Sequence, residues 1–333
     1  DMDRARQAAF LRAGAIDQFW GPGHASSLIL STNARPVPTV GLFRSRATQS
    51  DSKWLSWLGP WYASAEVGQL ESDRVVPDTR LWRTRFSFKP LSGLSIGFSW
   101  AAMWGGEGQP GSWSDFVDVI TFKKECINDL ATCDEELNTT KGNHIAGFDI
   151  KYTFMLADRP VSLYAQRIGE DAVDGYRITD NANLVGISTY AGPVKFFAEH
   201  SDTNIACNGD GSTTTDCYYE HGTYKSGYRY YQRAIGSTWD SDAKQLTIGA
   251  RWHAEDGKSA YAALTRFELN PDGTRPSPVL EGRQSEDGYF LTGYYQQAFN
   301  AFLVRVGGTV VQSDSGETDN TDATGYVDIK YYW

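Results

Sequence analysis

Short segments in which apolar and polar residues alternate dominate this sequence. In 246–254, Leu246 and Ile248 share one face of an extended chain, whereas Thr247 and Arg251 share the other. A period of two is typical of a β-strand with one apolar face. The polar faces repeatedly carry Arg, Lys, Asp or Glu in mid-strand, as expected for a wet or salt-bridged lumen. The same alternation recurs in 82–89, 145–154, 302–310 and 327–333.

The alternation predicts an all-β fold of about fourteen antiparallel strands. Several of their apolar faces end in Trp, Tyr or Phe, which is typical of the aromatic girdles at membrane interfaces. We expect the strands near 8–16, 37–45, 61–71, 79–89, 94–103, 143–155, 160–169, 183–191, 193–201, 244–255, 258–269, 287–298, 301–312 and 323–333.

The predicted connections alternate between short and long. Short turns are expected at 89–93, 157–159, 192, 256–257 and 299–300, and long loops at 104–142, 170–182, 202–243, 270–286 and 313–322. A transmembrane barrel has short periplasmic turns and long extracellular loops, whereas a soluble sandwich has no reason for this asymmetry. The sequence therefore predicts a transmembrane antiparallel β-barrel.

The composition argues against a helical membrane protein and against a nucleic-acid-binding protein. No stretch of the 333 residues approaches the roughly 18 apolar residues of a membrane-spanning helix. Aromatic residues make up 14% of the chain, and there are 33 glycines, which suits a β-rich surface protein. The formal net charge of −10 argues against binding to a phosphate backbone, so we expect no nucleic-acid partner.

The four cysteines form two close pairs, Cys126 with Cys133 and Cys207 with Cys217. Both pairs lie in polar stretches that are predicted to be loops. In zinc sites the paired cysteines are separated by fewer residues and histidines lie nearby, whereas the histidines of this sequence are scattered. We therefore expect two local disulfides, an oxidising compartment and no bound metal.

Three clusters rich in aromatic residues and glycine lie at 19–24, 54–61 and 103–110. One interpretation is tight loop packing that closes the barrel mouth. The other is a carbohydrate platform, because flat aromatic rings stack on the apolar faces of sugar rings. On the second interpretation, the candidate binding residues of these loops are Trp20, His24, Trp104 and Trp113.

The predicted loop 202–243 holds the densest cluster of tyrosines and basic residues. Stacking rings and cationic donors would suit an acidic polysaccharide. The alternative interpretation is a loop packed on itself as a lid, and the sequence leaves both open. The candidate binding residues are Tyr218, Tyr224, Lys225, Tyr228, Arg229 and Tyr230.

The three clusters, together with the motifs at 146–149, 168–171 and 224–228, occur in an order that resembles the capsule-assembly Wzi family of outer-membrane proteins. The resemblance runs from about Ala15 to the end of the chain. It implies a barrel of roughly 18 strands that follows a small periplasmic helical bundle. We therefore expect residues 1–333 to be a single barrel domain, with the family's bundle and first strands absent from this sequence.

The resemblance implies a lectin in the bacterial outer membrane that binds and organises capsular polysaccharide without catalysis or a cofactor. The expected partners are capsular or exopolysaccharide, membrane lipid and lipopolysaccharide. The sequence holds no His-Glu-x-x-His zinc motif, although paired carboxylates leave a glycosidase open.

A porin-like channel for oligosaccharides or ions is the alternative function. Charged residues on the polar strand faces would then line the lumen and select the solute. The predicted lumen charges are Arg83, Arg85, Asp149, Lys151, Arg251 and Arg305.

Overall fold

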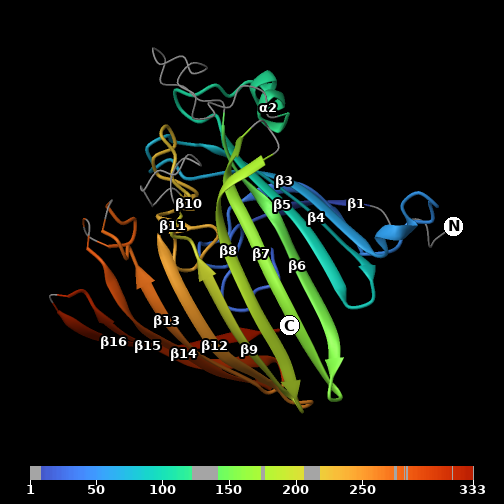
Figure 1. Ribbon diagram of the computed structural model, residues 1–333, viewed down its shortest axis with the longest axis vertical. Helices are drawn as coiled ribbons and strands as arrows, with labels where there is room; N and C mark the ends of the chain where they lie inside the picture. Colours follow the sequence, from blue (N-terminus) through green and yellow to red (C-terminus); the bar gives the residue numbers. More distant parts are fainter. Residues whose placement is uncertain are drawn as a thin grey trace.

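A computed structural model describes residues 9–121, 142–173, 177–205, 218–273, 276–280, 282, 284–316 and 318–332. Within these ranges, fourteen strands form one sheet in chain order, and each strand is antiparallel to its neighbours (Figure 1). They are β1 (Ala9–Gly14), β2 (Thr39–Arg44), β3 (Trp61–Gln69), β4 (Arg80–Leu91), β5 (Leu94–Trp104), β6 (Asn143–Leu156), β7 (Arg159–Val173), β8 (Arg177–Ala191), β9 (Val194–Asp202), β12 (Ala243–His253), β13 (Ser259–Leu269), β14 (Glu286–Phe299), β15 (Phe302–Asp314) and β16 (Asp319–Tyr331). The prediction of an all-β antiparallel sheet is confirmed.

The remaining elements are short. A two-stranded ribbon consists of β10 (Arg229–Tyr230) and β11 (Arg233–Ala234). The helix α2 (Trp113–Ile120) follows β5, and the 3-10 helix η1 (Ser56–Leu58) precedes β3. Among the described residues, no helix has both the length and the apolar character to cross a bilayer.

The two faces of the sheet differ as the alternation predicts. Large apolar side chains on one face are exposed, such as Ile248 of β12 with an exposed fraction of 62%. Its neighbour Thr247 points to the other face and is buried, as is Gln166 of β7. Apolar residues can stay exposed on a stable barrel when lipid, rather than water, covers them.

The connections separate the two ends of the sheet. Tight turns join β4 to β5, β6 to β7, β8 to β9 and β14 to β15, whereas long segments join β5 to β6 and β9 to β12 at the other end (Figure 1). Two loops that were expected to be long are short, because only 174–176 joins β7 to β8 and 315–318 joins β15 to β16. Their polar residues extend the strands instead, since a hairpin ladder beyond the membrane needs no apolar face.

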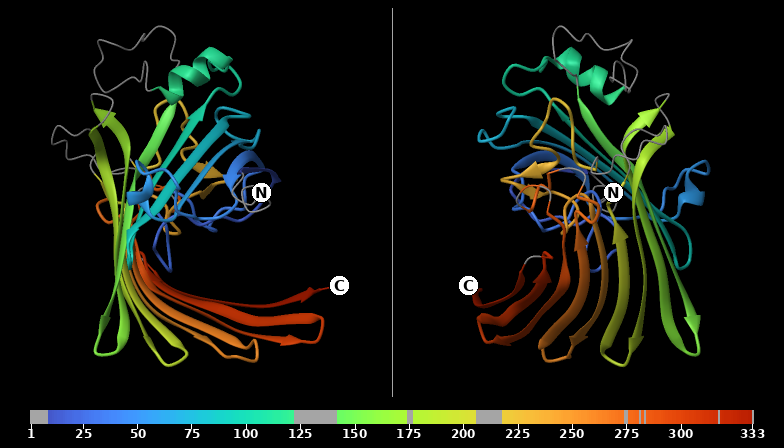
Figure 2. Two further views of the ribbon diagram at one scale, coloured as in Figure 1. Left: turned by 90° about the vertical axis from the view of Figure 1, so that its right-hand side faces the viewer. Right: turned by 60° about the vertical axis from the view of Figure 1, so that its left-hand side comes forward.

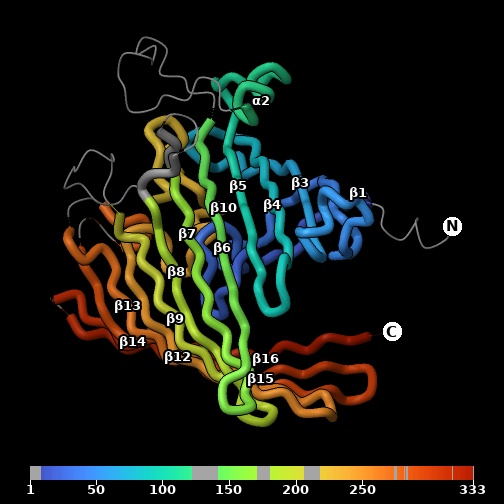
Figure 3. Tube along the Cα trace, turned by 45° about the vertical axis from the view of Figure 1, so that its right-hand side comes forward, coloured from blue at the N-terminus to red at the C-terminus, as the bar shows by residue number. Residues whose placement is uncertain are grey.

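The sheet curves like a barrel wall, and the chain order places β1 and β16 at its two edges. The last strands, drawn in orange and red, swing away from the first ones, so that β16 ends apart from β1 (Figures 2 and 3). The blue segment that follows β1 and the yellow segment that follows β9 lie on the concave side (Figure 2). The main cluster of buried apolar side chains lies among these two segments and the strands β4 to β8.

Candidate functional site

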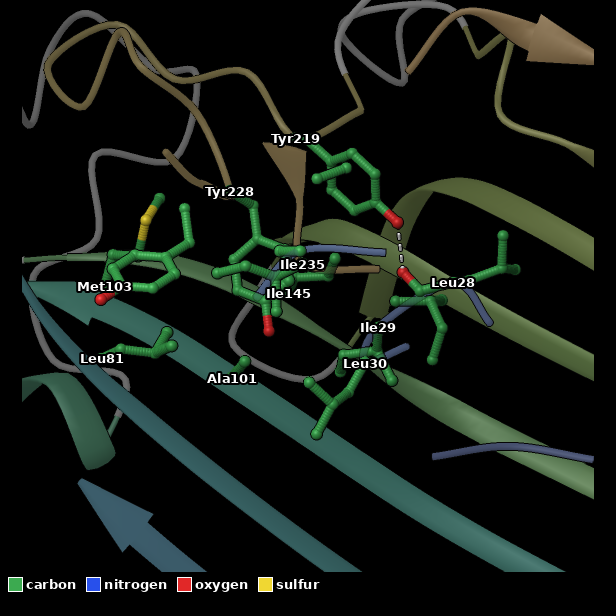
Figure 4. Close-up of a cluster of buried hydrophobic side chains, with 14 of the residues drawn as sticks. Leu28, Ile29, Leu30, Leu81, Ala101, Met103, Ile145, Tyr219, Tyr228 and Ile235 are labelled. Atoms are coloured by element: carbon green, nitrogen blue, oxygen red, sulfur yellow. Dashed lines mark hydrogen bonds between the residues drawn. The ribbon is translucent and has the colours of Figure 1, made fainter. Parts of the chain in front are cut away.

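Residues 15–38, which we call the inner loop, connect β1 to β2 on the concave side of the sheet. Leu28, Ile29 and Leu30 form an apolar run in its middle, and all three side chains are buried. They pack against strand residues such as Ala101 and Ile145 (Figure 4). The inner loop therefore occupies space that would otherwise be lumen.

A carboxylate of the barrel wall fixes the inner loop. Glu199 of β9 accepts hydrogen bonds from three successive backbone N–H groups, those of His24, Ala25 and Ser26, at 2.6, 3.3 and 3.0 Å. The hydroxyl of Tyr164 donates a fourth, at 3.2 Å. Hydrogen bonds to an ionised acceptor are stronger than neutral ones, so this contact ties the loop to the wall.

Residues 218–242, which we call the tyrosine loop, cover the inner loop. The hydroxyls of Tyr218 and Tyr219 both donate to the backbone oxygen of Leu28, at 2.7 and 2.6 Å. Figure 4 shows the hydrogen bond of Tyr219. The N–H of Ser31 donates to the backbone oxygen of Ile235 at 2.9 Å. The two loops therefore form one packed unit, which we call the plug.

An ion pair inside the tyrosine loop holds its shape. The guanidinium of Arg229 donates through Nε to both carboxylate oxygens of Asp240, at 3.0 Å each. Its Nη2 lies 2.6 Å from Oδ1 of Asp240 and 2.6 Å from Oε1 of Glu220. Arg229 is buried, so this positive charge is neutralised within the loop rather than offered to a ligand.

The candidate rings of the tyrosine cluster are buried in the structure. Tyr218, Tyr224 and Tyr228 have exposed fractions of 1% or less, and Tyr230 is also buried. Their rings pack on the inner loop and on each other, which leaves no ring face open for a sugar. The geometry of the described residues is that of the alternative interpretation, a self-packed lid. Lys225 remains exposed.

The candidates of the other loops are divided between core and surface. Trp20 of the inner loop is buried, and Trp104 is buried against Phe116 of α2. Trp113 is 77% exposed at the start of α2. The rings of Trp104 and Trp113 both contact that of Phe116, at 4.9 and 5.2 Å, whereas Trp20 belongs to a separate buried cluster.

His24 packs against the barrel wall. Its ring lies 5.5 Å from that of Tyr164 and 5.1 Å from that of Phe197. Burial lowers the pKa of His24 to about 3, with smaller contributions from the cations Lys195, Lys151 and Arg251. His24 is therefore neutral at physiological pH and acts as a packing residue rather than as a cationic sugar ligand.

The predicted lumen charges lie on the inner face, and most have partners there. Arg83 lies 3.1 Å from Glu66, and Arg85 lies 2.8 Å from Asp149. The other three cations have no ion pair among the described residues. Arg305 donates a hydrogen bond to Gln296 at 2.6 Å, and the guanidinium of Arg251 lies 5.3 Å from the centre of the Tyr261 ring. Lys151 is half-buried. Paired charges stabilise the wall and leave fewer free groups to select a solute.

A polar cleft opens where the tyrosine loop meets the segment between β3 and β4. Its volume is about 590 Å³. The residues around it are Glu71, Ser72, Asp73, Arg74, Val75, Ser226, Arg229, Gln232 and Pro278. All of them belong to connections at the long-loop end of the sheet, so the cleft faces the side that the barrel topology assigns to the exterior.

Sequence reasoning missed the residues that organise this end. Glu71 was predicted only as the last residue of a strand, and no role was predicted for Arg74 or Glu199. The run Leu28–Leu30 carried a usable signal, because three consecutive apolar residues in a predicted loop indicate a buried segment. The predicted disulfide residues Cys126, Cys133, Cys207 and Cys217 lie outside the described residues.

Together, the sheet and its plug define a class of protein. An antiparallel wall that is apolar outside and polar inside, with long loops folded into one end, is a plugged β-barrel of the outer-membrane type. Within that class, the chain belongs to the capsule assembly protein Wzi family, whose model matches residues 6–327. The resemblance inferred from the sequence motifs is confirmed.

Individual relatives agree with this family. An uncharacterised 55.8 kDa protein in the cps region of Klebsiella pneumoniae is 35% identical over 199 residues. The alignment covers 58% of this chain and 38% of that protein, so the chain spans well under two thirds of this relative.

Solved structures show the same fold. Wzi of Escherichia coli, an outer-membrane protein involved in group 1 capsule assembly and a carbohydrate-binding β-barrel, has a TM-score of 0.78 at 24% identity. The match covers 98% of this chain and 68% of that one. OccK10 (OpdN) of Pseudomonas aeruginosa is a more distant match, with a TM-score of 0.50 at 9% identity over 98% of this chain and 82% of that one.

Proposed function

We propose that this chain is an outer-membrane β-barrel that binds capsular or related surface polysaccharide at its long-loop end, without catalysis. The observation that carries the proposal is the plug, which turns the mouth of the barrel into a rigid polar surface with a cleft. The likeness to a carbohydrate-binding barrel of the same family supports it. The same proposal takes residues 1–333 as one domain, since the core of the plug includes side chains of the strands β4 to β8.

The plug also argues against the channel alternative. Its core residues come from the inner loop, the tyrosine loop and the wall, and they are packed without exposure to solvent. The lumen arginines Arg83 and Arg85 are engaged with Glu66 and Asp149. A channel needs an open water path with unpaired groups along it.

Attachment of a polysaccharide does not require tight binding to one sugar. A long polymer presents the same unit many times, and many barrels in one membrane bind it together. We therefore expect weak affinity for short oligosaccharides and firm retention of the intact polymer. Lipid and lipopolysaccharide would contact the apolar outer face, where Ile248 and its neighbours are exposed.

Three measurements on the purified barrel test this proposal. In detergent micelles it should co-sediment with the surface polysaccharide of its own strain. In planar bilayers it should give currents far below those of an open pore with the same number of strands. Incubation with the polysaccharide should release no new reducing ends. Loss of co-sedimentation together with a large conductance would favour the channel, and released reducing ends would favour a hydrolase.

A further inference from the structure

The cleft between the β3–β4 segment and the tyrosine loop has a chemistry that specifies its ligand. We propose that it is a subsite for a neutral, hydroxyl-rich sugar unit, whose hydroxyls donate to Glu71 and Asp73. This inference rests on the proposed function, because it names the kind of sugar that the polysaccharide presents there. It differs from the sequence-based expectation of an acidic polysaccharide held by cations.

The size and walls of the cleft suit a sugar unit. Its volume of about 590 Å³ lies within the range of small-molecule sites. One wall is the segment 71–75 and another is the tyrosine loop, which contributes Ser226, Arg229 and Gln232. The two walls are joined by a hydrogen bond from the N–H of Val75 to the hydroxyl of Ser226 at 2.9 Å. The cleft is therefore preformed rather than assembled around its ligand.

The cations of the cleft are already used. Arg74 donates from Nη1 to the backbone oxygen of Arg229 and from Nη2 to that of Gly227, at 3.0 Å each. Arg229 is neutralised by Asp240 and Glu220. Of these two guanidinium groups, only Nε of Arg74 lacks a hydrogen-bond partner among the described residues, and it is buried. Little positive charge is therefore left for the carboxylate of a uronate or other acidic sugar.

The acceptors, in contrast, have spare capacity. The side chain of Glu71 is only 4% exposed, yet its Oε2 accepts no hydrogen bond among the described residues. The closest cation is Nη1 of Arg74, at 3.5 Å. A buried carboxylate oxygen without a donor is costly, and a sugar hydroxyl in the cleft would supply that donor.

Two further groups complete the polar lining. Asp73 is exposed at the cleft and adds a second carboxylate, whereas Gln232 offers both a donor and an acceptor. The two carboxylates would repel an acidic sugar. The hydroxyls of a neutral sugar can donate to these acceptors without that repulsion.

Calorimetry on the detergent-solubilised barrel tests the inference with two series of oligosaccharides of increasing length, which we call ladders. The neutral ladder is made of hexoses, and the acidic ladder is oligogalacturonate. The wild-type protein should bind the neutral ladder and not the acidic one. Glu71→Gln should weaken binding of the neutral ladder about tenfold, or about 1.4 kcal/mol. Asp73→Asn, at an exposed position that cannot disturb the core, should weaken it about threefold. Glu107→Gln removes an exposed carboxylate of the neighbouring loop and should change nothing.

The outcomes separate this inference from the proposed function. Preference of the wild-type protein for oligogalacturonate, or neutral-sugar binding that EDTA abolishes, overturns the subsite proposal. Unchanged neutral-sugar binding by both cleft variants also overturns it, while co-sedimentation of the native polysaccharide would leave the proposed function standing. If the wild-type protein does not retain the native polysaccharide, the proposed function itself fails. Heat-modifiable migration checks that each variant is folded.

Discussion

Two tyrosines of the tyrosine loop are equally buried but differ in the hydrogen bonds of their hydroxyls, so their hydroxyls contribute differently to stability. Tyr219 and Tyr228 are both fully buried in the same apolar cluster. The Tyr219 hydroxyl donates to the backbone oxygen of Leu28 at 2.6 Å and accepts from the N–H of Ser237 at 2.7 Å. The hydroxyl of Tyr228 has no hydrogen-bond partner among the described residues. Removal of each hydroxyl therefore has a different expected cost.

We predict that Tyr219→Phe destabilises the folded barrel by about 1–3 kcal/mol, because it leaves the buried N–H of Ser237 without its acceptor, while the backbone oxygen of Leu28 keeps the hydrogen bond from Tyr218. Tyr228→Phe is the matched control and should be neutral or slightly stabilising, since it removes a polar atom that is not satisfied. The measurement is the midpoint of urea unfolding in lipid vesicles, followed by heat-modifiable migration. Equal midpoints for the two variants would contradict the role assigned to the Tyr219 hydroxyl.

At the scale of single elements, successive side chains of a strand lie in different environments, one on the exposed apolar face and the next on the buried inner face. In β12 the side chain of Ile248 lies on the exposed apolar face, and that of Thr247 lies on the buried inner face. The register fixes this arrangement, because Ile248 lies opposite Ala198 of β9 and Leu264 of β13 on the same face. A slip of one residue would turn every apolar side chain toward the lumen.

A charge in the middle of β12 tests the lipid-facing assignment. We predict that Ile248→Arg destabilises the barrel by about 2–4 kcal/mol, because the guanidinium would have to leave water for the hydrocarbon layer. Ile248→Val keeps the face apolar and should cost much less. The fraction of heat-modifiable, folded protein after refolding into vesicles reports the difference. Equal folding of the arginine variant would mean that this face contacts water.

At the scale of the whole molecule, the plug joins loops that are far apart in the sequence to one wall. Two of its histidines are partly buried. Burial lowers the pKa of His221 to about 4, and its Nδ1 accepts the N–H groups of Thr223 and Tyr224 at 3.1 and 3.2 Å. His24, with a pKa of about 3, lies between the inner loop and the wall. Both side chains must be neutral for the plug to keep this packing.

The plug should therefore loosen in mild acid. A histidine with a lowered pKa in the folded state stabilises the fold above its unfolded pKa of about 6.5 and loses that contribution as the pH falls toward the folded value. We predict faster proteolysis of the inner loop at pH 5 than at pH 7. The double variant His24→Gln, His221→Gln should lose most of this difference, whereas His253→Gln, at the opposite end of the barrel, should retain it. Cleavage rates that do not depend on pH would contradict the prediction.

Much of the fold could be predicted from the alternation alone. All fourteen strands of the sheet correspond to expected segments, and the exposed faces of β6, β12 and β16 are those that the pattern assigned to lipid. The boundaries were less certain near Glu170, where polar residues continue the β7 strand beyond the apolar face. A local pattern detects where a strand has an apolar face, but not how far its backbone ladder continues.

The candidate site was predicted less well. The tyrosine loop was recognised, but the sequence left open whether Tyr218, Tyr224 and Tyr228 form a binding platform or a packed lid. In the structure they form the core of the plug. An aromatic ring has the same identity in a binding platform and in a packed core, so composition cannot separate the two. The cleft at Glu71 involves segments more than a hundred residues apart, as the Val75–Ser226 contact shows, and no local pattern signals such a contact.

By itself, therefore, the sequence determined the class of sheet, the order of its strands, the face that meets lipid and the end that carries the long loops. These properties follow from the alternation of side chains and from chain connectivity, which are local. Only the tertiary structure decided that the inner loop and the tyrosine loop fill the mouth, that Arg229 is neutralised and that Oε2 of Glu71 accepts no hydrogen bond among the described residues. Those properties depend on which distant groups come into contact, because burial and pairing arise only when the chain has folded.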